Sequence, residues 1–331
     1  MKKFLGLIVV LTACTVSVET DNDTNTQNLP APDHFLTSDQ THNKFSRSIP
    51  PVLTVNSGAV IEMSTEEATD GQLSLDSDTS DLMSLSFEPI HPLTGPVFVN
   101  EAQPGDVLAV TLHKIEIGAW GWTAILPGFG FLADEFTEPH LRTFELAGKN
   151  NVRFADGINI PLKPFAGVLG VAPDTDSLLS TIPPRANGGN MDDPNMVEGT
   201  TVYLPVFVEG ALFSIGDAHA AQGLGEVCGT AIEAPMKFIV ELNLVKGVDM
   251  KEPQYENDDV YAVTAFATTI DKAAQKATGY MIDYLVANYG LTRNDAYMLC
   301  SLAGDLKIAE VVDVPHVLVT MSINKEVIQL K

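Results

Sequence analysis

Short runs of alternating apolar and polar residues, separated by Gly and Pro, recur from about Ser48 to Val260 and limit the possible folds most strongly. The run AQPGDVLAVTLHKIEIG begins at a Pro-Gly-Asp turn and then sends side chains to two faces in turn. KFIVELNLVKG repeats this pattern, and TTVYLPVFVEGALFSIGD holds two β-rich runs joined at Glu-Gly. A period of two is typical of strands, so this region predicts many short strands. Frequent turns favour a sandwich or barrel-like architecture of the jelly-roll type.

The C-terminal third changes to a helical period. Apolar residues recur every three or four positions over residues 270–285, with Thr268 or Thr269 as N-cap and Gly290 where a helix would stop. A Thr-x-x-Asp pair resembling a capping box precedes a second helical stretch, and HVLVTMSI predicts a closing strand. The sequence therefore predicts a mainly β fold with a smaller α/β portion near the C-terminus.

The chain of 331 residues carries a formal net charge of −24. An acidic surface of this kind repels phosphate backbones, which argues against nucleic acid as a partner. The sequence leaves open whether the protein forms a homo-oligomer.

The N-terminus has the order of a bacterial lipoprotein signal. Lys2 and Lys3 precede an apolar run, which ends at Leu-Thr-Ala-Cys14. This order predicts a signal peptide over residues 1–13 and a lipid on Cys14, so that the protein is exported and anchored to a membrane. The alternative is an ordinary secretory signal with an incidental Cys. Residues 14–45 are polar and predict a flexible tether to a folded domain over residues 46–331.

The stretch SIGDAHAAQGLGEVCGTAIE, residues 214–233, concentrates polar groups among glycines. If this segment is extended, Asp217 and His219 share one face, and the glycines allow Glu226 to fold back toward them. A carboxylate beside an imidazole forms half of a metal site. In RANGGNMDD, Asn190 and Asp192 also alternate and offer oxygens to the same ion. The alternative for both segments is a glycine-rich loop whose polar groups serve only the local backbone or solvent.

Two aromatic residues and one histidine near these motifs also need an interpretation. Trp120 and Trp122, in GAWGWTAILPGFGFLADEF, either wall a small pocket or pack in the core. His91 precedes Pro92 and is interpreted as structural. Cys228 and Cys300 either form a disulfide or remain as two buried free thiols, and the apolar context of each favours the thiols.

Several ordered motifs resemble the acetamidase/formamidase family from about Pro51 to the C-terminus. They are HPLTGPVFVNEAQPGDVLAV, PGFGFLADEF, GGNMDD, SIGDAHAAQGLGEVCGTAIE and SLAGDLKIAEVVD. The resemblance implies a mainly β fold with a smaller α/β portion and a bound metal. It also implies hydrolysis of short aliphatic amides, such as formamide or acetamide, to carboxylate and ammonia.

Carried over by motif, Asp192, Asp217 and His219 are the implied metal ligands, and His219 also belongs to the catalytic group. Glu226 is implied as a ligand or general base, and Gln222 as a donor to the amide oxygen. Mixed oxygen and imidazole ligands favour zinc, with calcium as the alternative.

One position departs from the family pattern QGDGE, because this chain has Leu224 in place of the Asp. Activity is in doubt if that Asp helps to bind the metal or to transfer protons, and the change is harmless if the side chain faces solvent. Two other functions stay open: an amidase with Cys228 as nucleophile, and a non-catalytic ligand-binding surface lipoprotein on the same scaffold.

Overall fold

The computed structural model describes residues 29–329. The predicted signal peptide, the lipid attachment at Cys14 and the first half of the predicted tether lie outside the described residues. Within residues 29–329, no helix has both the length and the apolar character needed to cross a bilayer.

The largest sheet has nine strands and is antiparallel except where β1 joins β5. Its order is β1 (His34–Leu36), β5 (Ala59–Thr65), β17 (Met236–Val245), β7 (Val107–Ile117), β15 (Thr201–Pro205), β18 (Gln254–Glu256), β19 (Val260–Ala267), β21 (Val317–Asn324) and β20 (Gly304–Glu310). This order does not return on itself, so the sheet stays open. The mainly β prediction is confirmed, and its barrel-like variant is wrong.

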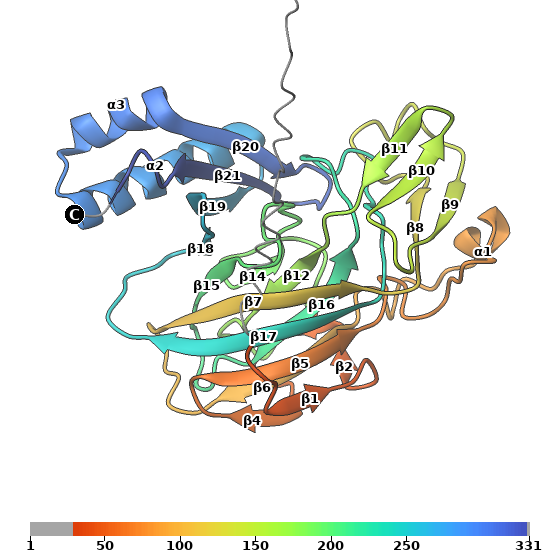
Figure 1. Ribbon diagram of the computed structural model, residues 1–331, viewed down its shortest axis with the longest axis horizontal. Coiled ribbons are helices and arrows are strands. Elements are labelled where there is room, and N and C mark those ends of the chain that lie inside the picture. Colours follow the sequence, from red (N-terminus) through yellow and green to blue (C-terminus); the bar gives the residue numbers. More distant parts are fainter. Residues whose placement is uncertain (1–28, 330–331) are drawn as a thin grey trace, which may run out of the picture.

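A second sheet has six strands and packs against the first half of the nine-stranded sheet (Figure 1). It consists of β14 (Gly188–Asn190), β12 (Phe165–Gly170), β16 (Phe213–His219), β6 (Leu93–Val99) and β2 (Thr41–His42), with β4 (Leu53–Val55) parallel to β6. Smaller pairs are β3 (Lys44–Phe45) with β13 (Leu179–Ser180), β8 (Trp120–Ile125) with β9 (His140–Glu145), and β10 (Asn151–Ala155) with β11 (Ile158–Pro161).

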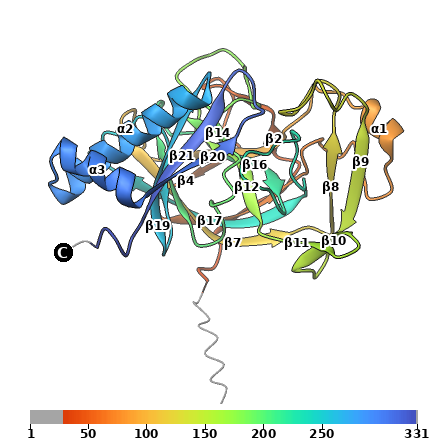
Figure 2. The same ribbon diagram turned by 90° about the horizontal axis from the view of Figure 1, so that it is seen from above.

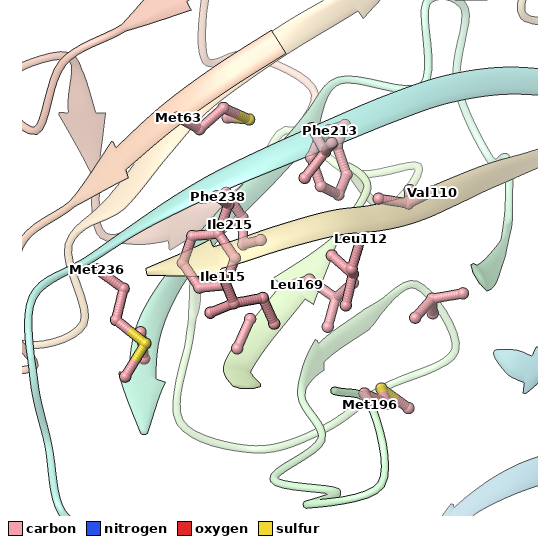
Figure 3. Packing of buried hydrophobic residues seen from close by; sticks show 14 of the residues in the cluster. Met63, Val110, Leu112, Ile115, Leu169, Met196, Phe213, Ile215, Met236 and Phe238 are labelled. Atoms are coloured by element: carbon pink, nitrogen blue, oxygen red, sulfur yellow. The ribbon is translucent and has the colours of Figure 1, made fainter. Parts of the chain in front are cut away.

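The main core fills the space between these two sheets (Figure 3). Leu112 and Phe238 project from the large sheet, and Leu169, Phe213 and Ile215 project from the small one; all five are fully buried. The alternation seen in the sequence thus places one face of each strand in the core. Burial of each such side chain contributes about 1.5–3 kcal/mol.

The second core lies where α2 (Ile270–Tyr289) and α3 (Arg293–Ala303) cover β19, β21 and β20 (Figure 2). Thr269 caps α2 by accepting a hydrogen bond from the Lys272 amide, and Gly290 ends it with a φ of 66°. Thr292 caps α3 in the same way. The predicted C-terminal portion is therefore confirmed. One short helix, α1 (Thr79–Met83), lies apart beside β9.

The predicted tether is wrong over its second half. Residues 34–45 form strands β1, β2 and β3 in three separate sheets. Leu36 and Phe45 are buried, and His42 Nε2 lies 2.7 Å from the Ser214 hydroxyl on β16. A few apolar anchors and strand pairings therefore order a segment whose overall composition is polar.

Candidate active site

A cavity of about 70 Å³ opens where β14 and β16 meet the start of β8. The acids of its lining are buried, at what we call the deep end, whereas its most exposed lining side chains, Phe87 and Phe129, are apolar and mark the outer end. The deep end is lined by His91, Asn190, Asp192, Asp217, His219, Glu226, Glu233 and Asp313. The other lining side chains include Leu85, Phe87, Ile90, Trp122, Leu126, Phe129 and Ile182.

The backbone at the deep end is strained. Among the described residues, eight non-glycine residues have a positive φ, and four of them line this cavity. These are His91 (57°), Asp192 (41°), Asp217 (46°) and Glu226 (45°). Such a conformation costs on the order of 1–3 kcal/mol for a residue with a Cβ, and it persists only where the surroundings enforce it. Its concentration here marks the deep end as a functional site.

A glycine on the neighbouring strand makes room for this cluster. A Cβ on Gly167 of β12 would lie 2.5 Å from Asp192 Oδ1, 2.7 Å from the Asp217 carbonyl oxygen and 2.8 Å from His219 Cε1. These atoms cannot move aside to make room, because all three residues are buried. Only glycine fits there.

Gly167→Ala is therefore expected to lower the catalytic rate by at least about 100-fold, since a displacement near 1 Å has an effect of this size. The measurement is amide turnover by the purified variant. Gly279→Ala is the matched control, because a Cβ at Gly279 on α2 meets no atom within 4 Å. We expect it to raise stability by about 0.5–1 kcal/mol with normal turnover. Normal turnover in Gly167→Ala would contradict the assigned site.

The hydrogen bonds of Gln222 fix the protonation of His219. Gln222 Nε2 donates to the carbonyl oxygen of Asp192 at 2.7 Å, so its Oε1 faces His219 Nδ1 at 2.8 Å. Since Oε1 only accepts, Nδ1 carries the hydrogen. Gln222 thus orients the ring and Asp192, and it does not line the cavity at all. The role of Gln222 as a donor to the amide oxygen stays a prediction, and in the structure its Nε2 donates to Asp192.

The other ring nitrogen of His219 faces two carboxylates. Nε2 lies 3.0 Å from Glu233 Oε2 and 3.7 Å from Asp217 Oδ1. With a hydrogen on Nδ1, Nε2 and the two carboxylate oxygens come together around a positive charge, which is either a second ring proton on Nε2 or a bound cation. On the far side of Asp217, His91 Nδ1 lies 3.7 Å from Oδ2.

These residues fit a bound cation. Glu233 Oε2 and Asp217 Oδ1 are buried and accept no hydrogen bond from the described residues. Imidazole nitrogen and carboxylate oxygen are both zinc ligands, and a catalytic zinc has three protein ligands and keeps a fourth position open for water. Burial lowers the pKa of His219, but Glu233 and Asp217 raise it well above its usual value. Burial would raise the pKa of Asp217, yet His91 and His219 hold it at about 2, so it stays ionised.

Further carboxyl groups lie on the Nδ1 side of His219. Asp192 Oδ1 is 3.5 Å from Nδ1, and Asp192, His219 and Glu226 form a second group able to hold a metal ion. Burial and neighbouring acids raise the pKa of Asp192 to about 6 and that of Glu310 to about 8. The pKa of Glu226 is raised well above its ordinary value by burial, then by Asp192. Such groups are poised to exchange protons near neutral pH.

Of the remaining residues singled out in the sequence, some line the cavity and others lie outside it. Asn190 lines the cavity and donates from Nδ2 to Asp313 Oδ2 at 2.8 Å. Trp122 also lines it, with Nε1 bonded to Glu67, whereas Trp120 does not reach it. Leu224, which replaces the usual Asp, is 48% exposed and lies outside the cavity. A carboxylate at position 224 would therefore lie outside the deep end.

The cysteines do not belong to the cavity. Both are free, which excludes a disulfide between Cys228 and Cys300. Cys300 is buried as expected, but Cys228 is exposed, so the prediction of a second buried thiol is wrong. Its Sγ donates to the Thr230 carbonyl oxygen at 3.3 Å.

Sequence reasoning missed three residues of the deep end. Glu233 ends the motif that contains Asp217, but no spacing rule tied it to His219, which it meets through an isolated bridge between the two backbones. His91 was interpreted as structural because it precedes a proline. Asp313 lies in a family-like motif near the C-terminus and gave no local signal of its own.

A strained cluster of acids and imidazoles at the base of a small cavity, on a mainly β scaffold, is the arrangement of a hydrolytic enzyme. The chain belongs to the acetamidase/formamidase family, whose model matches residues 32–180 and 176–330. The family places it among amidases, which hydrolyse carbon–nitrogen bonds of linear amides.

Relatives and solved structures agree with this assignment. The chain is 29% identical over 271 residues to an acetamidase of Mycolicibacterium smegmatis, a match that covers 62% of this chain and 66% of that protein, slightly under two thirds. An acetamidase from Bacillus halodurans superposes with a TM-score of 0.84 at 31% identity, covering 89% of this chain and 98% of that one. A gamma lactamase from Delftia acidovorans gives a TM-score of 0.64 at 25% identity, covering 88% and 93%.

Proposed function

We propose that this protein hydrolyses short linear amides to carboxylate and ammonia, with a divalent cation held by Asp217, His219 and Glu233. The main support for this proposal is the position of His219 Nε2. It lies 3.0 Å from Glu233 Oε2 and 3.7 Å from Asp217 Oδ1, both of which are buried, while Nδ1 carries a hydrogen. The names of its relatives, acetamidase and formamidase, support the substrate class. The ligand set favours zinc over calcium, which prefers oxygen ligands only.

The chain's own residues then have separate tasks. His91 keeps Asp217 ionised, and Gln222 holds the ring of His219 with Nε2 toward the cation. Glu226 lines the same cavity, and its raised pKa makes it an effective general base for the attacking water and then an acid for the leaving nitrogen. When bound, the cation would polarise the amide carbonyl and lower the pKa of water to about 7.

Ammonia release from acetamide and formamide, measured with and without a chelator, tests this function. We expect release that the chelator abolishes and that added zinc restores. Cys228→Ser separates the rival thiol mechanism, and we expect it to retain full activity because Cys228 lies outside the cavity. Activity that resists chelation but is lost in Cys228→Ser would establish the thiol amidase. No hydrolysis of either amide after metal loading would favour a non-catalytic ligand-binding protein.

We also propose that the protein is exported and anchored to a membrane through lipidated Cys14. The basic, apolar and Leu-Thr-Ala-Cys segments in sequence order support this location. Metabolic labelling with a radioactive fatty acid tests it, with Cys14→Ser as the unlabelled control.

A further inference from the structure

The outer end of the cavity differs chemically from the end that holds the acids. Six apolar side chains gather there: Leu85, Phe87, Ile90, Leu126, Phe129 and Ile182. They come from three loops, after α1, after β8 and after β13. No Lys, Arg, Asp or Glu side chain is interspersed among them in these parts of the cavity lining. Six such side chains offer more apolar surface than a methyl group or a hydrogen atom can cover.

Two aromatic rings dominate the apolar end and remain accessible. Phe87 and Phe129 stack with ring centroids 5.7 Å apart and an interplanar angle of 7°. Phe87 is 51% exposed and Phe129 is 37% exposed. Their free surface contributes little to folding, but an apolar group placed against it would gain roughly 25 cal/mol per Å² of area removed from water.

The backbone holds Phe129 in place beside the acids. A Cβ on Gly130 would lie 2.7 Å from the Cys228 carbonyl oxygen, and the Phe131 amide donates to the Val227 carbonyl oxygen at 2.9 Å. The loop that carries Phe129 is therefore pressed against the segment that follows Glu226. The ring of Phe129 and the proposed general base, Glu226, therefore line the same cavity on two segments that contact each other.

The chemistry of the lining sets the direction of a bound amide. The deep end is lined by carboxylates and imidazoles, which bind the polar amide group, whereas the outer lining is apolar. When the amide group reaches His219, its acyl substituent therefore points toward the apolar end. A short acyl group leaves Phe87 and Phe129 uncovered, whereas a longer one covers them.

We propose that the preferred substrates are amides with an apolar acyl group of several carbons or an aromatic ring, which packs against Phe87 and Phe129. This proposal rests on the amidase function proposed above. It differs from formamide or acetamide hydrolysis because the acyl group itself supplies part of the binding energy.

The test compares kcat/KM for acetamide, hexanamide and benzamide in the metal-loaded protein. We expect hexanamide or benzamide to exceed acetamide by at least about tenfold, the scale of discrimination in an apolar pocket. Phe87→Ala and Phe129→Ala are each expected to lower kcat/KM for hexanamide and benzamide about tenfold more than kcat/KM for acetamide. Phe35→Ala is the matched control, because Phe35 on β1 is 65% exposed and lies outside the cavity.

Each contrary outcome has its own meaning. Acetamide turnover without faster turnover of the larger amides would overturn the proposal and leave the amidase function intact. Equal losses for all three amides in Phe87→Ala would also overturn it. A changed oligomeric state in that variant, with selectivity preserved, would make the apolar end a contact between copies instead. Failure to hydrolyse any amide would refute the proposed function itself.

Discussion

Replacing His219 by Ala is expected to lower kcat/KM for amide hydrolysis by roughly 10³-fold or more. His219 supplies the only imidazole within 3.7 Å of both Asp217 and Glu233 among the described residues. A metal ion contributes several kcal/mol of transition-state stabilisation, and each 1.36 kcal/mol is tenfold in rate. The measurement is ammonia release at saturating zinc. His113→Ala is the control, since His113 on β7 pairs with Glu241 on β17 and neither residue lines the cavity.

Loss of folding could imitate this result, so a rescue experiment accompanies it. The alanine leaves a space the size of the ring, and free imidazole at high concentration is expected to restore part of the activity. Rescue requires an intact fold around an empty ligand position. Full activity of His219→Ala without imidazole would contradict the proposed site.

Glu226→Gln is expected to lower kcat by about 10²- to 10⁴-fold, the usual contribution of a general acid–base group. Glutamine keeps the size and polarity of the side chain but cannot take a proton. Since burial and Asp192 raise the pKa of Glu226 in the folded protein, wild-type activity should rise with pH through a value above 4.5. This limb of the pH profile should disappear in the variant.

The matched control is Glu145→Gln, because the Glu145 side chain is 73% exposed on β9. It should leave both the rate and the pH profile unchanged. If Glu226→Gln retained the wild-type rate and its acidic limb, proton transfer would have to be assigned to another carboxyl group at the deep end.

Local patterns predicted most of the fold. The alternating runs became β7, β15, β16 and β17, and helical spacing with Thr269 and Gly290 gave the ends of α2. Sheet closure could not be predicted, because it depends on which strands pair over long distances. The ordering of residues 34–45 was also missed, since composition does not show that Leu36 and Phe45 will find buried positions.

The candidate site was predicted only in part, because local sequence patterns do not show which distant segments meet. Asp217 and His219 lie two residues apart on β16 and meet as expected, although Asp217 has a left-handed backbone and not an extended one. Asp192 also reaches His219, but on the Nδ1 side. Glu233 and His91 come from other segments, so only the assembled structure brings them to the same centre.

Elemental analysis of the purified wild-type protein, of His219→Ala and of Glu233→Gln tests the central claim most directly. If Asp217, His219 and Glu233 are ligands, the wild type will carry a divalent ion in stoichiometric amount, zinc by preference, and both variants will lose most of it. If the wild type binds no ion after incubation with zinc, or if both variants keep the full amount, the buried carboxylates around His219 do not form a metal site.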